Sequence, residues 1–313
     1  MMSAAVPQAF GRIALIGYGE VGRILAEDLR AQGLAVAAHD LKLQQPAQAA
    51  ALQAHAQDHG VLLHAQAADA VAGADLVISA VTASQAVAVA EAAAPHLQAG
   101  AVFIDMNSAS PGAKQRAAGV VDAAGGQYVE GAVMTSVPPY RIRVPLLLGG
   151  PHAAAVVAPL NALGFAAKLA DERLGVASAT KMCRSVMIKG LEAMVIESLS
   201  TARHYGVEDA VIASLYETFP GIDWEKQAAY FFQRVIEHGR RRSEEVREVA
   251  ETVREAGLEP WSASGTAERQ AWVADLADAG VFGQRGEAGF ARSADWRTEA
   301  DRLLAAVAQE RQR

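Results

Sequence analysis

The sequence of 313 residues has a single cysteine, Cys183, and no long hydrophobic run. One cysteine excludes an internal disulfide and a cysteine-rich metal site, and we expect it to pack within a helix. A membrane-spanning helix needs about 20 apolar residues in succession, so no membrane partner is expected. Positive charge is not in excess, because 28 basic residues stand against 35 acidic ones and the formal net charge is −7. This balance disfavours nucleic acid as a partner.

The first residues of the sequence do not predict a secretory signal peptide. Residues 1–9 have neither the charged start nor the apolar core of a signal peptide, and they read as a loose tail. We therefore expect a cytoplasmic protein. With 51% hydrophobic residues, the chain is rich enough in apolar side chains to bury a sizeable core. Its length exceeds that of one typical domain and predicts two.

The most informative stretch is Gly17-Tyr18-Gly19-Glu20-Val21-Gly22. A short apolar run, residues 12–16, precedes it and is typical of a buried parallel strand. After the glycines, apolar residues recur at helical spacing, and Gly33 ends this predicted helix. A second apolar run, residues 34–38, then leads to Asp40. Strand, glycine turn, helix, strand and acid in this order predict a dinucleotide-binding unit.

Each residue type in this fingerprint has a physical role. Gly17 allows the tight turn, Gly19 lets a pyrophosphate approach the backbone, and Gly22 lets the helix pack on its strand. The N–H groups at the helix start, with the positive end of its dipole, bind the phosphates. Asp40 is placed to accept the ribose hydroxyls and would repel a 2′-phosphate, which favours NAD. Lys42 softens this preference, so NADP is possible.

Further polar residues follow the later predicted strands. Val81 and Thr82 end one apolar run, and Asn107 and Ser108 follow the next. In a doubly wound sheet, ligands lie at the carboxyl ends of the strands. We therefore expect Val81, Thr82 and Asn107 to contact the cofactor and Ser108 the substrate. The alternative is that Asn107 and Ser108 cap the following helix.

The pattern predicts two domains of different class: a Rossmann-type, doubly wound α/β domain over residues 1–174 and an all-helical domain over residues 175–313. The remaining strands of the first domain are predicted at residues 61–63, 74–81, 101–104, 127–133, 143–148 and 165–169. The helices of the second are predicted at residues 178–205, 207–219, 223–238, 243–256, 266–279 and 294–309. Residues 240–242, three arginines, are interpreted as helix-end charges or a local patch, and residues 260–265 as a loop.

Together these features resemble the β-hydroxyacid dehydrogenase superfamily, which includes 6-phosphogluconate and 3-hydroxyisobutyrate dehydrogenases. The resemblance covers nearly the whole chain, and the helical half is closest to a divergent 6-phosphogluconate-dehydrogenase-like branch. The family's substrate motif, D-A-P-V-S-G-G, is replaced here by residues 130–136. The serine has become Met134 and the two glycines Thr135 and Ser136. The resemblance implies that these three residues bind substrate, with the two hydroxyls as donors.

The family's catalytic stretch, G-x-G-x-x-x-K-x-x-x-N, matches residues 175–185. Lys181 falls on the catalytic lysine, Ala177 replaces the second glycine, and Ser185 replaces the asparagine that orients substrate. The resemblance implies that Lys181 exchanges the proton or stabilises the developing oxyanion, with Ser185 beside it. Glu192 is an alternative proton carrier.

An acidic substrate also needs a positive charge to hold it. The candidates are Arg184, Lys189, Arg141, Arg143 and His238. For each of them an ordinary surface position is the competing interpretation. Lys189 and Glu192 are three residues apart and would then pair with each other.

The implied function is an NAD(P)-dependent oxidoreductase that interconverts a small hydroxy acid, or a phosphorylated analogue, and its oxo form. Relatives dimerise through the helical domain, so a homodimer is also implied. Two alternatives stay open. The resemblance extends to imine reductases, and the altered motifs are compatible with an NAD-binding module without turnover.

Overall fold

The computed structural model describes residues 10–287, 289–291, 293 and 295–311. The chain forms two compact units, Met1–Met182 and Cys183–Arg313. The predicted N-terminal tail, residues 1–9, lies outside the described residues, as does Ala294 at the start of the last predicted helix. Within the described ranges, every helix is too short or too polar to traverse a bilayer.

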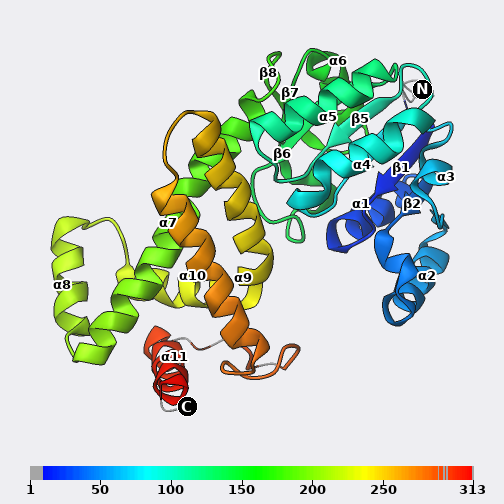
Figure 1. Ribbon diagram of the computed structural model, residues 1–313. Helices are drawn as coiled ribbons and strands as arrows, with labels where there is room; N and C mark the ends of the chain where they lie inside the picture. Colours follow the sequence, from blue (N-terminus) through cyan, green and yellow to red (C-terminus); the bar gives the residue numbers. More distant parts are fainter. Residues whose placement is uncertain (1–9, 288, 292, 294, 312–313) are drawn as a thin grey trace, which may run out of the picture. The chain divides into compact units, whose positions relative to one another are not determined.

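The first unit alternates strands and helices, as the sequence predicts (Figure 1). Its strands are β1 (Arg12–Ile16), β2 (Ala35–His39), β3 (Leu62–Leu63), β4 (Leu76–Ser79), β5 (Val102–Asp105), β6 (Gln127–Val133), β7 (Pro145–Gly149) and β8 (Ala166–Asp171). Its α-helices are α1 (Glu20–Ala31), α2 (Pro46–His59), α3 (Ala67–Val71), α4 (Ala86–Ala93), α5 (Pro111–Ala123) and α6 (Ala153–Ala162). Four 3₁₀ turns complete it: η1 (Leu41–Gln44), η2 (Ala83–Gln85), η3 (Ala94–His96) and η4 (Arg141–Arg143).

The strands form one sheet in the order β3-β2-β1-β4-β5-β6-β7-β8. The strands from β3 to β6 are parallel, β7 runs antiparallel to β6, and β8 is parallel to β7. The strand order reverses at β1, and ligands of doubly wound sheets bind at the carboxyl ends of the strands at such a point, here β1 and β4. The α/β Rossmann prediction is confirmed.

Helices cover both faces of the sheet because its strands are apolar on both faces. Ile13 and Leu15 of β1 face a core that contains residues of α1, α2 and α6. Ala14 and Ile16, which alternate with them, face a core that contains residues of α3, α4 and α5. Both sides of β1 are therefore buried, which explains why its sequence is continuously apolar rather than alternating.

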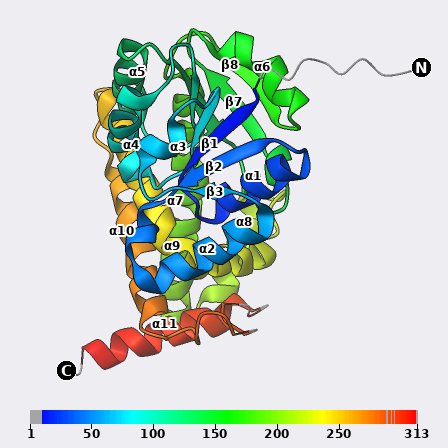
Figure 2. The same cartoon turned by 90° about the vertical axis from the view of Figure 1, so that its right-hand side faces the viewer.

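The described residues of the second unit form α-helices joined by turns and loops, without a β-strand. Helix α7 (Val176–Tyr205) begins in the first unit and continues into the second. The others are α8 (Glu208–Thr218), α9 (Trp224–Glu255), α10 (Trp261–Asp278) and α11 (Trp296–Glu310). Figures 1 and 2 both show α9 and α10 side by side. Their packing residues, including Phe232, Val235 and Val273, form the core of this unit with Trp296.

Two predictions for this unit are wrong. Residues 223–238 and 243–256 belong to one continuous helix, α9, rather than two. Gly239 does not end a helix; a Cβ there would lie 2.7 Å from the carbonyl oxygen of Gln270, so the glycine permits close contact with α10. The predicted loop at residues 260–265 is largely the first turn of α10, which starts directly after Pro260. Proline is tolerated there because the first N–H groups of a helix have no intrahelical partner.

Candidate functional site

The glycine turn joins the carboxyl end of β1 to the start of α1. Gly17 has φ +96°, and a Cβ on it would lie 2.3 Å from the carbonyl oxygen of Ala80. A Cβ on Gly22 would lie 2.0 Å from the carbonyl oxygen of Gly17. Both glycines are therefore required by the protein's own backbone. Around Gly19, in contrast, a Cβ would meet no protein atom within 4 Å.

The open space at Gly19 lies at the N-terminus of α1. Gly19 is the N-cap residue and provides no side-chain hydrogen bond to the first turn of the helix. The first N–H groups of a helix have no intrahelical acceptor, and the helix dipole favours an anion there. The predicted contacts Tyr18, Glu20 and Val21 belong to this turn. The residues present therefore fit the pyrophosphate of a dinucleotide.

Asp40 follows β2 and is tied to the same turn. One carboxylate oxygen accepts a hydrogen bond from the backbone N–H of Tyr18 at 2.7 Å. The other accepts from the backbone N–H of Lys42 at 2.9 Å, which caps the 3₁₀ turn η1. Each carboxylate oxygen has a second lone pair, so Asp40 retains the capacity to accept ribose hydroxyls.

Asn107 connects the ends of β4 and β5. Its side-chain oxygen accepts from the backbone N–H of Val81 at 2.6 Å, and its side-chain nitrogen donates to Ser79 at 2.9 Å. Asn107 is only 3% exposed, so its main role in the structure is to hold the two strand ends together. It does not cap the next helix, because Ser110 is the N-cap of α5. Val81 is half-buried, whereas Thr82, the next residue, is exposed.

Ser108, the next residue, contacts the predicted catalytic lysine. The Lys181 Nζ donates a hydrogen bond to the Ser108 Oγ at 2.6 Å. Both residues belong to the first unit, and both are half-buried. The structure therefore brings the lysine of α7 to the carboxyl end of β5, which is where a ligand of this sheet binds.

The start of α7 is fixed by Glu130, a buried residue of β6. Its carboxylate accepts from the backbone N–H groups of Gly175 and Ala177, each at 2.9 Å. The Ser178 hydroxyl donates to its second oxygen at 2.9 Å. A carboxylate at the N-terminus of a helix satisfies its free N–H groups and favours its dipole. Glu130 thus positions the helix that carries Lys181.

A buried ion pair supports the neighbouring strand end. Asp105 at the end of β5 and Lys114 of α5 are each 1% exposed and lie 2.8 Å apart. Asp105 also accepts from the Tyr128 hydroxyl at 2.8 Å and from the backbone N–H of Asn107 at 2.9 Å. Burial, together with the charge of Asp105, raises the pKa of Tyr128 well above its usual value. The phenol therefore stays protonated and remains a donor.

These supporting residues were not among the predicted site residues. Ser79, Asp105 and Glu130 occupy neighbouring register positions on β4, β5 and β6, which places their side chains in one row. The sequence does carry one signal for them: Glu130 is a charged residue within the predicted strand at residues 127–133, and a buried charge needs partners. Identification of those partners requires the strand register.

The residues expected to bind substrate differ in their surroundings. Met134 follows β6 and is half-buried, whereas Thr135 and Ser136 are exposed. Arg143 is exposed as well. Arg141 donates to Asp28 at 2.9 Å and to Glu27 at 2.7 Å, so it is bound to α1.

Four predicted residues belong to the second unit. Arg184 is exposed, Ser185 is 9% exposed, and Lys189 is 7% exposed. Lys189 donates to Glu245 at 2.5 Å, and burial lowers its pKa. His238 lies 3.6 Å from Glu237, and its pKa is lowered by burial and by nearby arginines.

Two smaller expectations about α7 are wrong. Lys189 and Glu192 do not pair, because Lys189 contacts Glu245 while Glu192 binds Arg242, both on α9. Glu192 is 1% exposed and enclosed by charged partners, including Arg234 at 3.7 Å. Cys183 is exposed rather than packed in a core.

Comparison with known proteins places these features in context. Residues 12–155 match the NAD binding domain of 6-phosphogluconate dehydrogenase, and residues 202–273 match a domain of unknown function, DUF1932. A conserved hypothetical protein from Sinorhizobium meliloti 1021 is 40% identical, with a TM-score of 0.73, and the match covers 94% of this chain and 96% of that one.

Two further solved structures are similar. A conserved protein of unknown function, described as structurally similar to 3-hydroxyacid dehydrogenases, is 28% identical with a TM-score of 0.66; the match covers 86% of this chain and 98% of that one. Mycobacterium tuberculosis 3-hydroxyisobutyrate dehydrogenase, in a structure with L-serine, is 16% identical with a TM-score of 0.68; the match covers 94% of this chain and 99% of that one. The last likeness concerns the fold alone.

Proposed function

Since the chain belongs to the 6-phosphogluconate-dehydrogenase-like proteins in which an NAD-binding domain precedes a DUF1932 domain, we propose that it is an NAD(P)-dependent oxidoreductase of the 3-hydroxyacid dehydrogenase type. It interconverts a small hydroxy acid, or a phosphorylated analogue, and the corresponding oxo acid or semialdehyde. The observation that carries this proposal is the contact between Lys181 and Ser108 at the carboxyl end of β5.

Residues of the first unit hold the cofactor in this proposal. The turn at Gly19 and the N-terminus of α1 bind the pyrophosphate, and Asp40 binds the ribose hydroxyls. Val81 and Thr82, which follow β4, contact the cofactor in this proposal. Asp40 favours NAD over NADP because a carboxylate repels a 2′-phosphate.

Lys181 handles the proton. When bound, NAD(P) supplies or accepts the hydride. During reduction, the Lys181 ammonium donates a proton from Nζ to the substrate oxygen, which would otherwise carry a negative charge. During oxidation, the neutral amine takes the hydroxyl proton while the carbinol hydrogen leaves as hydride. Ser108 holds the Nζ in place by its 2.6 Å hydrogen bond.

The remaining predicted residues bind and orient the substrate. Met134, Thr135 and Ser136 provide an apolar contact and two hydroxyls after β6. Ser185 follows Lys181 by four residues in α7 and therefore lies one turn further along the same helix. Arg184 and Lys189 are the proposed cations for an acidic group, although Lys189 first has to exchange its partner Glu245. His238, whose lowered pKa favours the neutral ring, is proposed as a hydrogen-bond donor to the substrate.

The test is nicotinamide absorbance with NADH and NADPH over oxo acids, semialdehydes and imines, and with NAD and NADP over hydroxy acids and sugar acids. The variant is Lys181→Ala, and the control is Lys168→Ala, because Lys168 of β8 is exposed. Loss of general acid–base catalysis typically lowers turnover by about 10²–10⁴-fold. We expect a loss in this range for Lys181→Ala, with unchanged NADH binding, and none for the control.

Other results would contradict the proposal in different ways. Turnover that survives Lys181→Ala removes the lysine from the chemistry. Activity on imines alone indicates a C=N reductase. Cofactor binding without turnover on any substrate indicates a non-catalytic NAD-binding module.

We also propose a homodimer formed through the second unit. Met187 and Met194 lie seven residues apart on α7, and they are 72% and 61% exposed. Seven residues are two helical turns, so both side chains lie on one face. Light scattering after gel filtration tests this proposal: the wild type should have twice the mass of the chain, and Met194→Lys should shift the species toward the monomer.

A further inference from the structure

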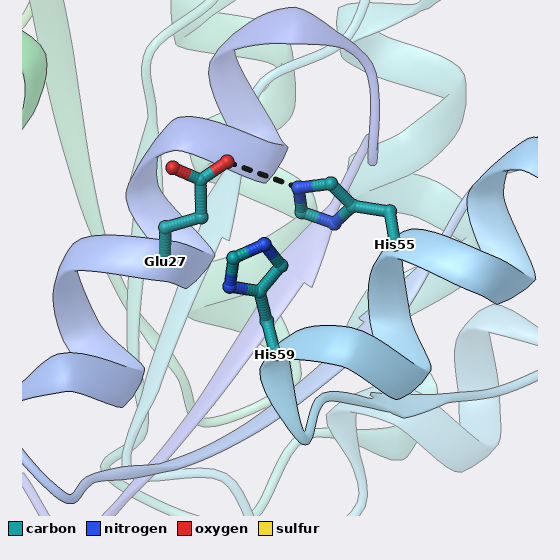
Figure 3. Close-up of side chains that lie close together, drawn as sticks. All are labelled: Glu27, His55 and His59. Carbon is teal, nitrogen blue, oxygen red and sulfur yellow. Dashed lines mark hydrogen bonds and ion pairs between the residues drawn. The ribbon is translucent and has the colours of Figure 1, made fainter.

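Two helices of the first unit bring a glutamate and two histidines together. Glu27 lies on α1, and His55 and His59 lie on α2, four residues apart and therefore on one face of that helix. Figure 3 shows the Glu27 carboxylate and the two imidazole rings turned toward one another. One ligand atom from each residue lies within 4.8 Å of the other two.

We propose that Glu27, His55 and His59 form a binding site for a divalent transition-metal ion such as Zn²⁺ or Co²⁺. Two imidazole nitrogens and one carboxylate oxygen are the donors that such ions prefer, whereas Mg²⁺ and Ca²⁺ favour oxygen alone. Three protein ligands leave a fourth tetrahedral position for water. The site stands apart from the proposed hydride transfer and does not depend on it.

The ring of His55 is already oriented for this role. Its Nε2 faces the Glu27 Oε1 at 3.0 Å, and its Nδ1 lies 2.9 Å from the Tyr18 hydroxyl. Histidines that bind a metal usually make a hydrogen bond through the second ring nitrogen, which fixes the ring.

Glu27 is available as a charged ligand. Arg141 binds the second oxygen, Oε2, at 2.7 Å and leaves Oε1 directed at His55. The positive charge of Arg141 is shared with Asp28, which accepts from it at 2.9 Å.

His59 is the third proposed ligand and lies on the solvent-exposed side of the site. Its ring centroid lies 4.5 Å from that of His55, and the residue is exposed. A metal ion can therefore enter from solvent, and a substitution of His59 removes a ligand without opening the core. The ion would clamp α2 to α1, and through His55 it would restrain Tyr18 in the glycine turn.

The experiment uses the full chain without an affinity tag, after treatment with a chelator. All variants carry Cys183→Ser, because the exposed thiol would otherwise bind metal. Co²⁺ titration followed by visible absorption reports ligand geometry, and calorimetry with Zn²⁺ reports affinity and stoichiometry. Circular dichroism of each variant shows that the fold is retained.

The expected result is one ion per chain with the spectrum of tetrahedral Co²⁺. His59→Gln and Glu27→Gln each remove a ligand. Loss of a group that only supports a ligand costs about 10–100-fold in metal affinity, so loss of a ligand itself should weaken affinity at least about 100-fold. Tyr18→Phe removes such a supporting group and should weaken it about tenfold. His96→Gln is the matched control: His96 is an exposed histidine of η3 in the same unit, and its replacement should change nothing.

Two results would overturn the proposal. One is the absence of Co²⁺ absorption and of Zn²⁺ heat at millimolar metal. The other is equal binding by wild type, His59→Gln and His96→Gln, which would assign the metal to other surface groups.

Discussion

The carboxylate of Glu130 and the backbone N–H of Ala177 lie 2.9 Å apart, and this hydrogen bond links the centre of the sheet to the helix that carries Lys181. Glu130 is fully buried, so its charge must be neutralised by protein groups. The donors are the N–H groups at the start of α7. The position of Lys181 therefore depends on a residue of β6 about fifty positions earlier in the chain.

Replacement of Glu130 should disturb both stability and turnover. Glu130→Gln removes the negative charge and places an NH₂ group among N–H donors. Hydrogen bonds to charged groups contribute about 1.5–3 kcal/mol each, so we expect a loss of about 2–3 kcal/mol in the free energy of unfolding. Urea unfolding measures the stability, and kcat should fall more than NADH affinity because only the helix of Lys181 is displaced.

Gly149→Ala provides an independent test of the same contact. A Cβ at Gly149 would lie 2.2 Å from the Glu130 Oε1, so the carboxylate has to move. Gly119→Ala is the control, because Gly119 lies within α5 with no atom within 4 Å of a Cβ and should become about 0.5–1 kcal/mol more stable. If Gly149→Ala and Gly119→Ala have equal effects on turnover, Glu130 does not position Lys181.

Substitutions in the glycine turn can distinguish an effect on stability from an effect on cofactor binding. Gly19→Ala should leave the melting temperature unchanged, since the added methyl meets no protein atom within 4 Å. It should weaken NADH binding about tenfold or more, a loss of about 1.4 kcal/mol, because the pyrophosphate needs this space. Fluorescence titration with NADH measures the affinity. Gly17→Ala is the contrasting variant and should unfold at lower temperature.

Much of the first unit follows from local pattern. The apolar run before Gly17 and the acid after β2 both lie within residues 12–40, so the dinucleotide-binding arrangement is predictable from about thirty residues. The same is true of Lys181, which the family resemblance identifies and the structure places against Ser108. Each of these features is recognised from a short stretch of sequence, although the position of Lys181 in space depends on Glu130 of β6.

The errors concern contacts between distant residues. Gly239 indicates a helix end until Gln270, on a separate helix, is known to pack against it. Lys189 and Glu192 are spaced as a pair, but each has a stronger partner on α9. The row formed by Asp105 and Glu130 depends on strand register, which no local pattern specifies.

Asp40 should determine the choice of cofactor. The wild type should bind NADH more tightly than NADPH, because the carboxylate repels the 2′-phosphate. Asp40→Ser keeps an oxygen that can cap η1 and should reduce the ratio of the two affinities about tenfold or more, equivalent to about 1.4 kcal/mol. Parallel titrations with both cofactors measure the ratio. Lys42→Ala is the control for charge, since it should shift the ratio toward NADH.

The buried pair of Asp105 and Lys114 should behave as one unit. Lys114→Met leaves an unpaired carboxylate in the interior, and removal of one partner of a buried pair costs about 3–5 kcal/mol. The double variant with Asp105→Asn removes both charges and should be more stable than the sum of the single changes indicates. Urea unfolding of the four proteins completes this cycle. Simple additivity would show that the two side chains do not interact.

Asp75 should make the first unit sensitive to acid. Its carboxylate accepts from the N–H groups of Arg12 at 2.9 Å and Gly11 at 2.8 Å, and these bonds lower its pKa below the usual 3.8. A lowered folded-state pKa stabilises the protein above the unfolded value, and this contribution is lost as the pH falls through the folded value.

Asp75→Asn removes the titration. At pH 7 the variant should lose about 1 kcal/mol, which lowers Tm by about 2–4 °C in a unit of this size. The difference from wild type should begin to shrink near pH 3.8, where the carboxyl of the unfolded chain takes up its proton, and should disappear only below the lowered folded-state pKa. Thermal melts between pH 3 and 7 measure the gap, with Asp58→Asn on the exposed end of α2 as the control. If the difference in Tm between Asp75→Asn and wild type does not depend on pH, the effect comes from the altered packing of the side chain and not from its charge.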